Sequence, residues 1–273
     1  MKIKPGINYD ITDKIYFADK KYMTRSSFLG LLNSVNHFKK EYNPEPTKAF
    51  KIGNMLDTLL TNSEEFYKIY TKAFIGDKRT KIGKALYAEW LKDNKDKKVI
   101  SENDLILLRN MAESLFLNPE TAKYFDKSNK YLYQVTVADN LIVDDDKKIP
   151  FKVRTDIWKE HDNYIEVVDL KTTAKLKDIE KSIEKYNYYL QDYLYSRIIA
   201  FSTGKPVTFK FIFVEKVHPF DSIEIELSDL WYDIAEDKLN HVLVPRYLAQ
   251  KATKKRLFTK GKVIDPPKWL KHD

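Results

Sequence analysis

The spacing of apolar positions changes near residue 127. From Thr24 to about Phe125 these positions recur at helical spacing, whereas later segments contain short runs of β-branched and aromatic residues that predict strands. The predicted helices span 24–40, 48–61, 63–72, 80–93, 101–117 and 228–250, with a short turn of helix after Pro119 and one helix, or two abutting ones, over 178–201. The predicted strands span 131–138, 149–158, 164–171, 207–217 and 221–227.

This pattern predicts an α/β fold in which helices flank a mixed central β-sheet. We expect residues 1–273 to form one domain, because the chain contains no internal repeat and no low-complexity linker. Its helical N-terminal part, at about 20–127, would form one wall of a cleft beside a core at about 128–250. A basic tail would follow at 251–273.

Asp169 and Lys171 lie at the polar end of the apolar run 164–171. Side chains alternate along a strand, so these two should project from the same face. Asp-x-Lys triplets also begin at Asp19, Asp93, Asp96, Asp145 and Asp146, all in polar stretches typical of solvated loops or helix faces. The triplet at Asp169 differs because a charge that ends a buried strand is costly unless it binds something. A carboxylate metal ligand beside a fixed cation indicates phosphodiester chemistry.

Asp156 lies in the preceding strand-like run, 13 positions before Asp169. The polar residues 159–163 predict a hairpin turn that would bring the two carboxylates together. Like charges repel, so the pair needs a cation, and hard oxygen ligands in a chain without cysteine favour Mg²⁺ or Mn²⁺. The alternative is an ion pair of Asp156 with Arg154 or a turn lysine. Alternation would place Val153, Thr155 and Ile157 on one face of this strand and Arg154, Asp156 and Trp158 on the other.

Gln191 and Tyr195 are four positions apart on the helical segment 178–201 and therefore share a face. An amide and a phenol on one face could orient water, metal-bound carboxylates or a DNA phosphate. An ordinary amphipathic surface would give the same spacing.

The chain resembles the PD-(D/E)XK nuclease superfamily in the order of three motifs: Arg154-x-Asp156, then Asp169-Leu170-Lys171-Thr172-Thr173, then Gln191-x-x-x-Tyr195. Within that superfamily the chain looks most like the exonuclease VIII (RecE-type) branch of phages and prophages. Similar segments at 23–32, 50–57, 211–216 and 266–270 extend the likeness over roughly residues 20–270. The resemblance implies a restriction-endonuclease-like core.

It also implies a metal-dependent exodeoxyribonuclease that degrades linear double-stranded DNA from its ends, 5′ to 3′, and leaves 3′ single strands for an annealing recombinase. The resemblance also leads us to expect a ring-shaped homo-oligomer. Its gene would belong to a phage or prophage, and the protein would work in the bacterial cytoplasm. The implied catalytic residues are Asp156, Asp169, Lys171, Gln191 and Tyr195. The implied ligands of Mg²⁺, or of Mn²⁺ as its substitute, are Asp57, Asp156, Asp169 and the carbonyl of Leu170.

The chain departs from this family at two positions. Asp57 stands where the branch usually has a histidine ligand, and Gln134 stands where an acidic residue is common. Asp57 is a hard oxygen ligand that could substitute, or it is a polar residue on an amphipathic helix. Gln134 could contact metal or water, or make a hydrogen bond at a strand edge. Two other functions remain open: a structure-specific or restriction-type endonuclease on the same core, and a catalytically inactive DNA-binding relative.

The composition fits a polyanionic partner. The 48 Lys and Arg residues outnumber the 40 Asp and Glu residues, giving a formal charge of +8 and a pI of about 9.1. The predicted DNA contacts are Arg154, Lys251, Lys254, Lys255 and Arg256, although a solvated tail would explain the last four. A second basic group could line a DNA channel and comprises Lys72, Lys78, Arg79, Lys81 and Lys84.

Other features of the sequence exclude several classes of protein. The absence of cysteine excludes disulfides, thiolate metal sites and cysteine catalysis, and the absence of a glycine-rich phosphate loop argues against an intrinsic ATPase. No segment resembles a signal peptide or a membrane span, so we expect a soluble cytoplasmic protein without a membrane partner.

Overall fold

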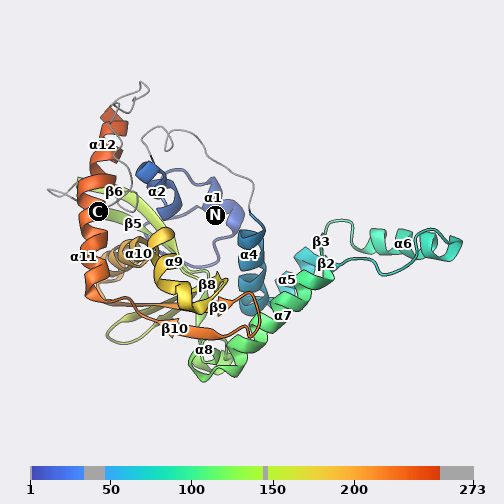
Figure 1. Cartoon of the computed structure of the whole chain (residues 1–273). Helices are drawn as coiled ribbons and strands as arrows, with labels where there is room; N and C mark the ends of the chain where they lie inside the picture. The colour runs from blue at the N-terminus through green and yellow to red at the C-terminus, as the bar shows by residue number, and fades with distance from the viewer. Residues whose placement is uncertain (1, 34–46, 144–146, 253–273) are drawn as a thin grey trace, which may run out of the picture.

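The computed structural model describes residues 2–33, 47–143 and 147–252 (Figure 1). The strands are β1 (Gly6–Asn8), β2 (Tyr70–Lys72), β3 (Lys98–Ile100), β4 (Leu132–Tyr133), β5 (Thr136–Val143), β6 (Lys147–Arg154), β7 (Ile157–Glu160), β8 (Ile165–Thr173), β9 (Val207–Glu215) and β10 (Ser222–Ile225). The α-helices are α1 (Asp13–Ala18), α2 (Arg25–Asn33), α4 (Lys48–Thr61), α5 (Ser63–Ile69), α6 (Lys81–Asp93), α7 (Glu102–Leu117), α8 (Pro119–Ala122), α9 (Ile179–Lys185), α10 (Tyr188–Thr203), α11 (Asp229–Lys238) and α12 (Val244–Ala252). A π-helical turn, η3 (Leu239–Leu243), joins the last two helices, and short 3₁₀ turns lie at η1 (Lys127–Asn129) and η2 (Leu176–Asp178).

A five-stranded mixed sheet with the order β10-β9-β8-β7-β4 forms the centre of the molecule. Strands β8 and β9 run parallel, and the connection between them contains α9 and α10, whereas the other neighbours are antiparallel. A smaller antiparallel sheet has the order β1-β5-β6. The predicted fold class, a mixed sheet flanked by helices, is confirmed.

Strand β8 is covered on both faces. Val167 belongs to a core cluster with Leu190 and Leu194 of α10, whereas its neighbour Val168 belongs to a second cluster with Leu56 of α4. Burial on both sides explains why this strand is an almost continuous apolar run in the sequence.

The strand predicted at 149–158 is divided between the two sheets. Strand β6 of the smaller sheet ends at Arg154, and β7 of the central sheet begins at Ile157. The predicted alternation is therefore wrong beyond this crossing: Val153 and Trp158 lie in one core cluster and Ile157 in the other. The two residues at the crossing, Thr155 and Asp156, lie in neither strand.

Two other predicted elements are interrupted by residues with left-handed backbone. Gln134, with φ of 56°, separates β4 from β5 within the predicted strand 131–138. Asn187, with φ of 52°, separates α9 from α10, which confirms the alternative of two abutting helices. The first predicted helix, 24–40, is present as α2 from Arg25, and its second half lies outside the described residues.

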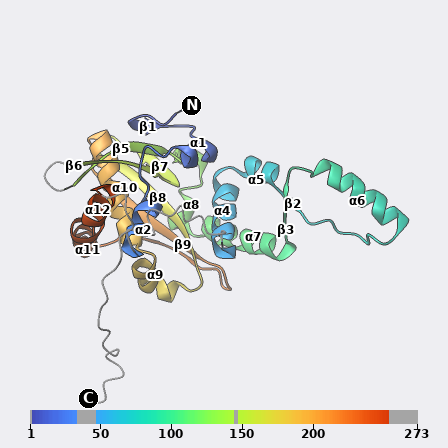
Figure 2. The same ribbon diagram turned by 90° about the horizontal axis from the view of Figure 1, so that it is seen from above.

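Residues 70–100, called the arm below, project from the body of the molecule (Figures 1 and 2). At its base β2 and β3 pair in parallel, and Ile100 is buried in the core cluster beneath α4. Farther out, the rings of Phe74, Tyr87 and Trp90 pack on one another. The sequence predicted helix α6 in this segment but not its projection. None of the described helices combines the length and the apolar character that crossing a membrane requires.

A buried carboxylate joins α10 to α11. Asp192 is 2% exposed and accepts hydrogen bonds from the hydroxyls of Tyr232 (2.5 Å) and Ser196 (3.1 Å). Burial raises its pKa to about 7, although these two hydrogen bonds oppose the shift. Between about pH 4 and pH 7 the folded chain therefore holds a proton that the unfolded chain has lost, so stability falls as pH rises through this window.

Asp192→Asn should remove this dependence, because an amide oxygen still accepts both hydrogen bonds. We expect the variant to match the wild type near pH 4 and to exceed it at pH 8 by about 2–4 kcal/mol in free energy of unfolding. Urea unfolding at the two pH values measures the difference. An equal fall in stability for both proteins would show that the Asp192 proton makes no contribution.

Candidate active site

The crossing between the two sheets places Asp156 beside β8. The ladder between β7 and β8 stops at the pair Ile157 and Val168, so β8 continues from Asp169 without that neighbour. The side chain of Asp156 accepts a hydrogen bond from the Leu170 amide at 3.0 Å. The change of sheet thus brings a carboxylate to a backbone donor one residue from Asp169, as the hairpin prediction required.

Asp169 is 3% exposed, and both of its oxygens are engaged. Oδ2 forms an ion pair with the ammonium of Lys171, and Oδ1 accepts a hydrogen bond from the amide of Gln191 at 2.5 Å. Tyr195, one turn farther along α10, packs edge-on against Phe209. Burial raises the pKa of Tyr195 well above its ordinary value, and the charges of Asp169 and Asp156 contribute to the shift. The structure therefore gathers the predicted residues of β8 and α10 in one place.

Helix α4 brings Asp57 to the same place. Its Oδ2 accepts a hydrogen bond from the Gln134 amide at 2.8 Å, and its Oδ1 is buried without a hydrogen bond from any residue that the structure describes. The backbone N–H of Gln134 donates to the carbonyl of Asp156 at 3.1 Å. Gln134 thus connects two of the predicted ligands, and its left-handed backbone turns its side chain toward Asp57.

The three carboxylates repel one another. Burial and the charges of Asp169 and Asp13 raise the pKa of Asp57 to about 7, with Lys171 opposing the shift. Burial, followed by the charges of Asp169 and Asp57, raises the pKa of Asp156 well above its ordinary value. One buried and two half-buried carboxylates that repel one another gain from a cation between them.

The donor set suits a hard divalent metal. Asp57, Asp156 and Asp169 supply carboxylate oxygens, which Mg²⁺ and Mn²⁺ prefer, and Asp57 has an oxygen with no hydrogen bond from the described part of the chain. The described residues include no three acidic or imidazole groups already converged on one point. Each carboxylate instead contacts a donor of the protein: Asp57 accepts from Gln134, Asp156 from the Leu170 amide, and Asp169 pairs with Lys171.

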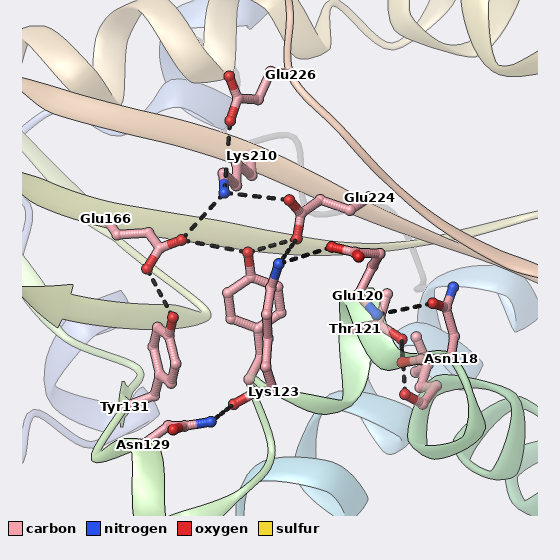
Figure 3. Close-up of polar contacts among 12 residues, drawn as sticks. Asn118, Glu120, Thr121, Lys123, Asn129, Tyr131, Glu166, Lys210, Glu224 and Glu226 are labelled. Atoms are coloured by element: carbon pink, nitrogen blue, oxygen red, sulfur yellow. Dashed lines mark hydrogen bonds and ion pairs between the residues drawn. The ribbon is translucent and has the colours of Figure 1, made fainter.

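A second polar cluster, around Glu166 and Lys210, provides a contrast (Figure 3). Glu166 and Asp169 are three residues apart on β8, so their side chains point to opposite faces of the sheet. Its centre is the ammonium of Lys210, which lies 3.4 Å from Glu166, 3.2 Å from Glu224 and 3.6 Å from Glu226. Burial opposes ionisation of Glu166, but hydrogen bonds from Tyr131 and His161 and the charge of Lys210 hold its pKa below the ordinary value. These carboxylates are neutralised by the protein itself, whereas Lys171 pairs with Asp169 alone and the pKa values of Asp57 and Asp156 stay raised. This difference makes the Asp57, Asp156 and Asp169 group the candidate functional site.

Arg25 is a site residue that the sequence reasoning did not single out. At the start of α2 its guanidinium donates to the carbonyls of Tyr186 (2.5 Å) and Asn187 (3.0 Å). Burial lowers the pKa of Arg25, and the charges of Tyr195 and Asp169 oppose this shift most strongly. A cation in the first turn of a helix is unfavourable for the helix dipole, and no acidic residue balances it there. This unfavourable position of a cation is the feature of the sequence that could have identified Arg25.

The predicted DNA contacts lie in different surroundings. The guanidinium of Arg154 donates to Asp13 (2.6 Å) and to the carbonyl of Ile11 (2.8 Å), so the N-terminal segment covers it. Lys251 is exposed at the end of α12, with its ammonium 5.5 Å from the centre of the Tyr247 ring. The other three, Lys254, Lys255 and Arg256, lie outside the described residues.

The fold and the carboxylate–lysine site define a domain of the PD-(D/E)XK class. Residues 30–256 match the family described as "PDDEXK-like domain of unknown function" (DUF3799), and the chain belongs to this family. The superfamily predicted from the sequence is thus confirmed, at a coarser level than the exonuclease VIII branch.

Two solved structures can be aligned with this chain. The crystal structure of a protein from Eubacterium rectale, described as "Putative exonuclease", aligns with a TM-score of 0.63 at 16% identity and covers 94% of this chain and 97% of its own. The crystal structure of SSO0001 aligns with a TM-score of 0.28 at 14% identity, over 77% of this chain and 84% of its own, which is too low to support an argument. No curated protein matches the chain.

Proposed function

We propose that this protein is a metal-dependent deoxyribonuclease that digests linear double-stranded DNA from an end. The observation that carries the proposal is the group of three mutually repelling carboxylates beside Lys171. Carboxylates with raised pKa values, such as Asp57 and Asp156 around the Asp169–Lys171 pair, are costly for the fold and are typical of functional sites. The "Putative exonuclease" description of the Eubacterium rectale protein supports an exonuclease rather than an endonuclease.

Asp156, Asp169, Asp57 and the Leu170 carbonyl would hold Mg²⁺, with Mn²⁺ as a substitute. When bound, such an ion would supply Lewis acidity, which would polarise the scissile phosphate and make a bound water more acidic. Lys171 would stabilise the charge that grows on the phosphate oxygens in the transition state. Gln191 fixes the orientation of Asp169 through its hydrogen bond, and Gln134 does the same for Asp57. Tyr195 and Arg25 would face the phosphate backbone from α10 and α2.

The finer parts of the proposal rest on the resemblance to the RecE-type branch. They are digestion from 5′ to 3′, a 3′ single-stranded product passed to an annealing recombinase, a ring-shaped homo-oligomer, and a phage- or prophage-encoded protein in the bacterial cytoplasm. In this arrangement residues 1–273 would act as one nuclease domain in each subunit.

Incubation with linear duplex DNA and Mg²⁺ or Mn²⁺ should release nucleotides, whereas a covalently closed circular duplex should stay intact. A label at the 5′ end should be released before a label at the 3′ end. Cleavage of the closed circle would establish an endonuclease instead. Binding of the linear duplex without release of nucleotides, with either metal, would identify an inactive DNA-binding relative.

A further inference from the structure

The arm, residues 70–100, carries most of the protein's excess positive charge. It contains nine Lys and Arg residues against four Asp and Glu residues, a net charge of 9 − 4 = +5 within a chain total of +8. This segment projects from the body (Figures 1 and 2), so its charge is displaced from the rest of the molecule. A projecting basic element attracts a polyanion and is unfavourable for contact with a surface of like charge.

The positive charge is concentrated where the arm is farthest from the body. Phe74 packs on Trp90, whereas Lys78 lies 3.7 Å from the centre of the Tyr87 ring and Asp77 contacts Gly83. The loop and the helix therefore run side by side, from a base at β2 and β3 to a tip at residues 77–84. Four of the eight tip residues are Lys or Arg.

The cations of the tip are largely unneutralised. Its single acidic residue, Asp77, is paired with Arg79 at 3.0 Å. Lys81 and Lys84 are exposed and form no ion pair with any residue that the structure describes. These two lysines also lie at the N-terminal end of α6, which has no acidic residue in its first turn. Positive charge at this end opposes the helix dipole, so the tip destabilises its own helix unless an anion is bound there.

We propose that the arm is a second DNA-binding surface, whose tip contacts the phosphate backbone of the duplex away from the cleavage site. The inference rests on the proposed function, because it takes duplex DNA as the partner. The exposed side chains of Ile75 and Ile82 would suit a protein partner as well. A second copy of this chain, however, also carries a net charge of +8 and offers no overall charge complementarity to the arm.

The test is a triple variant, Arg79→Gln/Lys81→Gln/Lys84→Gln, compared with Lys127→Gln/Lys147→Gln/Lys148→Gln. The control removes the same charge from exposed positions on the body. Binding of a long linear duplex is measured without divalent metal over a range of salt concentrations. For the tip variant the plot of log affinity against log salt should become shallower by about 0.9 for each phosphate that the tip no longer binds, whereas the control should keep the wild-type slope.

Gly83→Ala tests whether the position of the tip matters when its charge is unchanged. A Cβ at Gly83 would overlap the carbonyl oxygen of Asp77, so alanine should displace the tip loop without changing the net charge. We expect weaker duplex binding, with proteolytic cleavage newly directed to residues 77–83. In Mg²⁺, the tip variant and Gly83→Ala should both raise KM for linear duplex while leaving kcat unchanged.

Each outcome is decisive. A tip variant that binds DNA with the affinity and salt slope of the control overturns the inference, and so does one whose molar mass in solution falls, because the arm would then join copies of the chain. If the wild type binds duplex through the tip but hydrolyses nothing, the nuclease proposal fails and the arm inference stands. If the wild type binds no duplex, both fail.

Discussion

Lys171→Met is expected to lower kcat for hydrolysis of linear duplex DNA by about 10²–10³-fold, the usual loss when a single group that stabilises transition-state charge is removed. The Lys171 ammonium pairs with Asp169 and lies 5.1 Å from the centre of the Tyr188 ring, so its position is well defined. Methionine keeps most of the side-chain volume without the charge. Steady-state release of nucleotides measures the effect.

The same substitution should also destabilise the fold, by about 3–5 kcal/mol, because Asp169 would remain buried without its cation. The loss of activity must therefore be distinguished from the loss of folded protein. In the double variant Asp169→Asn/Lys171→Met no charge is left unpaired, so we expect most of the stability to return while activity stays lost.

Lys210→Met is the matched control. The side chain of Lys210 is 16% exposed and that of Lys171 is 17% exposed, and each ammonium neutralises buried carboxylate on its own face of the sheet. Removal of Lys210 should lower the free energy of unfolding and leave kcat for the folded fraction unchanged. If both variants lose kcat to the same extent, Lys171 has no specific role in the reaction.

Asp156→Asn should abolish activity and yet stabilise the metal-free protein, by about 0.5–2 kcal/mol. Burial and repulsion from Asp169 and Asp57 raise the pKa of Asp156. As pH rises above the ordinary aspartate range, the wild-type fold retains a proton that the unfolded chain releases, so the wild type loses stability relative to the variant. Asparagine can still accept the hydrogen bond from the Leu170 amide. Thermal unfolding in EDTA at several pH values measures the gain.

Added Mg²⁺ should reverse this order. A ligand that binds only the folded chain raises Tm by an amount that grows with the ratio of its concentration to Kd, so Mg²⁺ should stabilise the wild type and have little effect on Asp156→Asn. Asp192→Asn is the control, since Asp192 likewise has a raised pKa but lies between α10 and α11. It should gain stability, keep its response to Mg²⁺ and remain active. A wild type whose Tm is insensitive to both Mg²⁺ and Mn²⁺ would contradict the metal site.

The candidate site was predictable to the extent that it follows a local pattern. Asp169 and Lys171 share a face because they are two residues apart on a strand, and Gln191 and Tyr195 share a face because they are four apart on a helix. The hairpin between residues 157 and 168 followed from the polar turn and was confirmed. Arg25 and Gln134 were harder to place, since their contacts are made with residues more than 70 positions away.

By itself, the sequence determined the class of fold, most of its helices and strands, and the pairing of Asp169 with Lys171 on one face of a strand, because alternation, helical spacing and turn composition are local properties. The tertiary structure decided the rest. Asp156 faces Leu170 because the chain changes sheets at Thr155, and Gln134 reaches Asp57 because its backbone is left-handed where two strands separate. The projection of the arm also depends on where β2 and β3 leave the core. Each of these features arises from packing between distant segments, which no local pattern encodes.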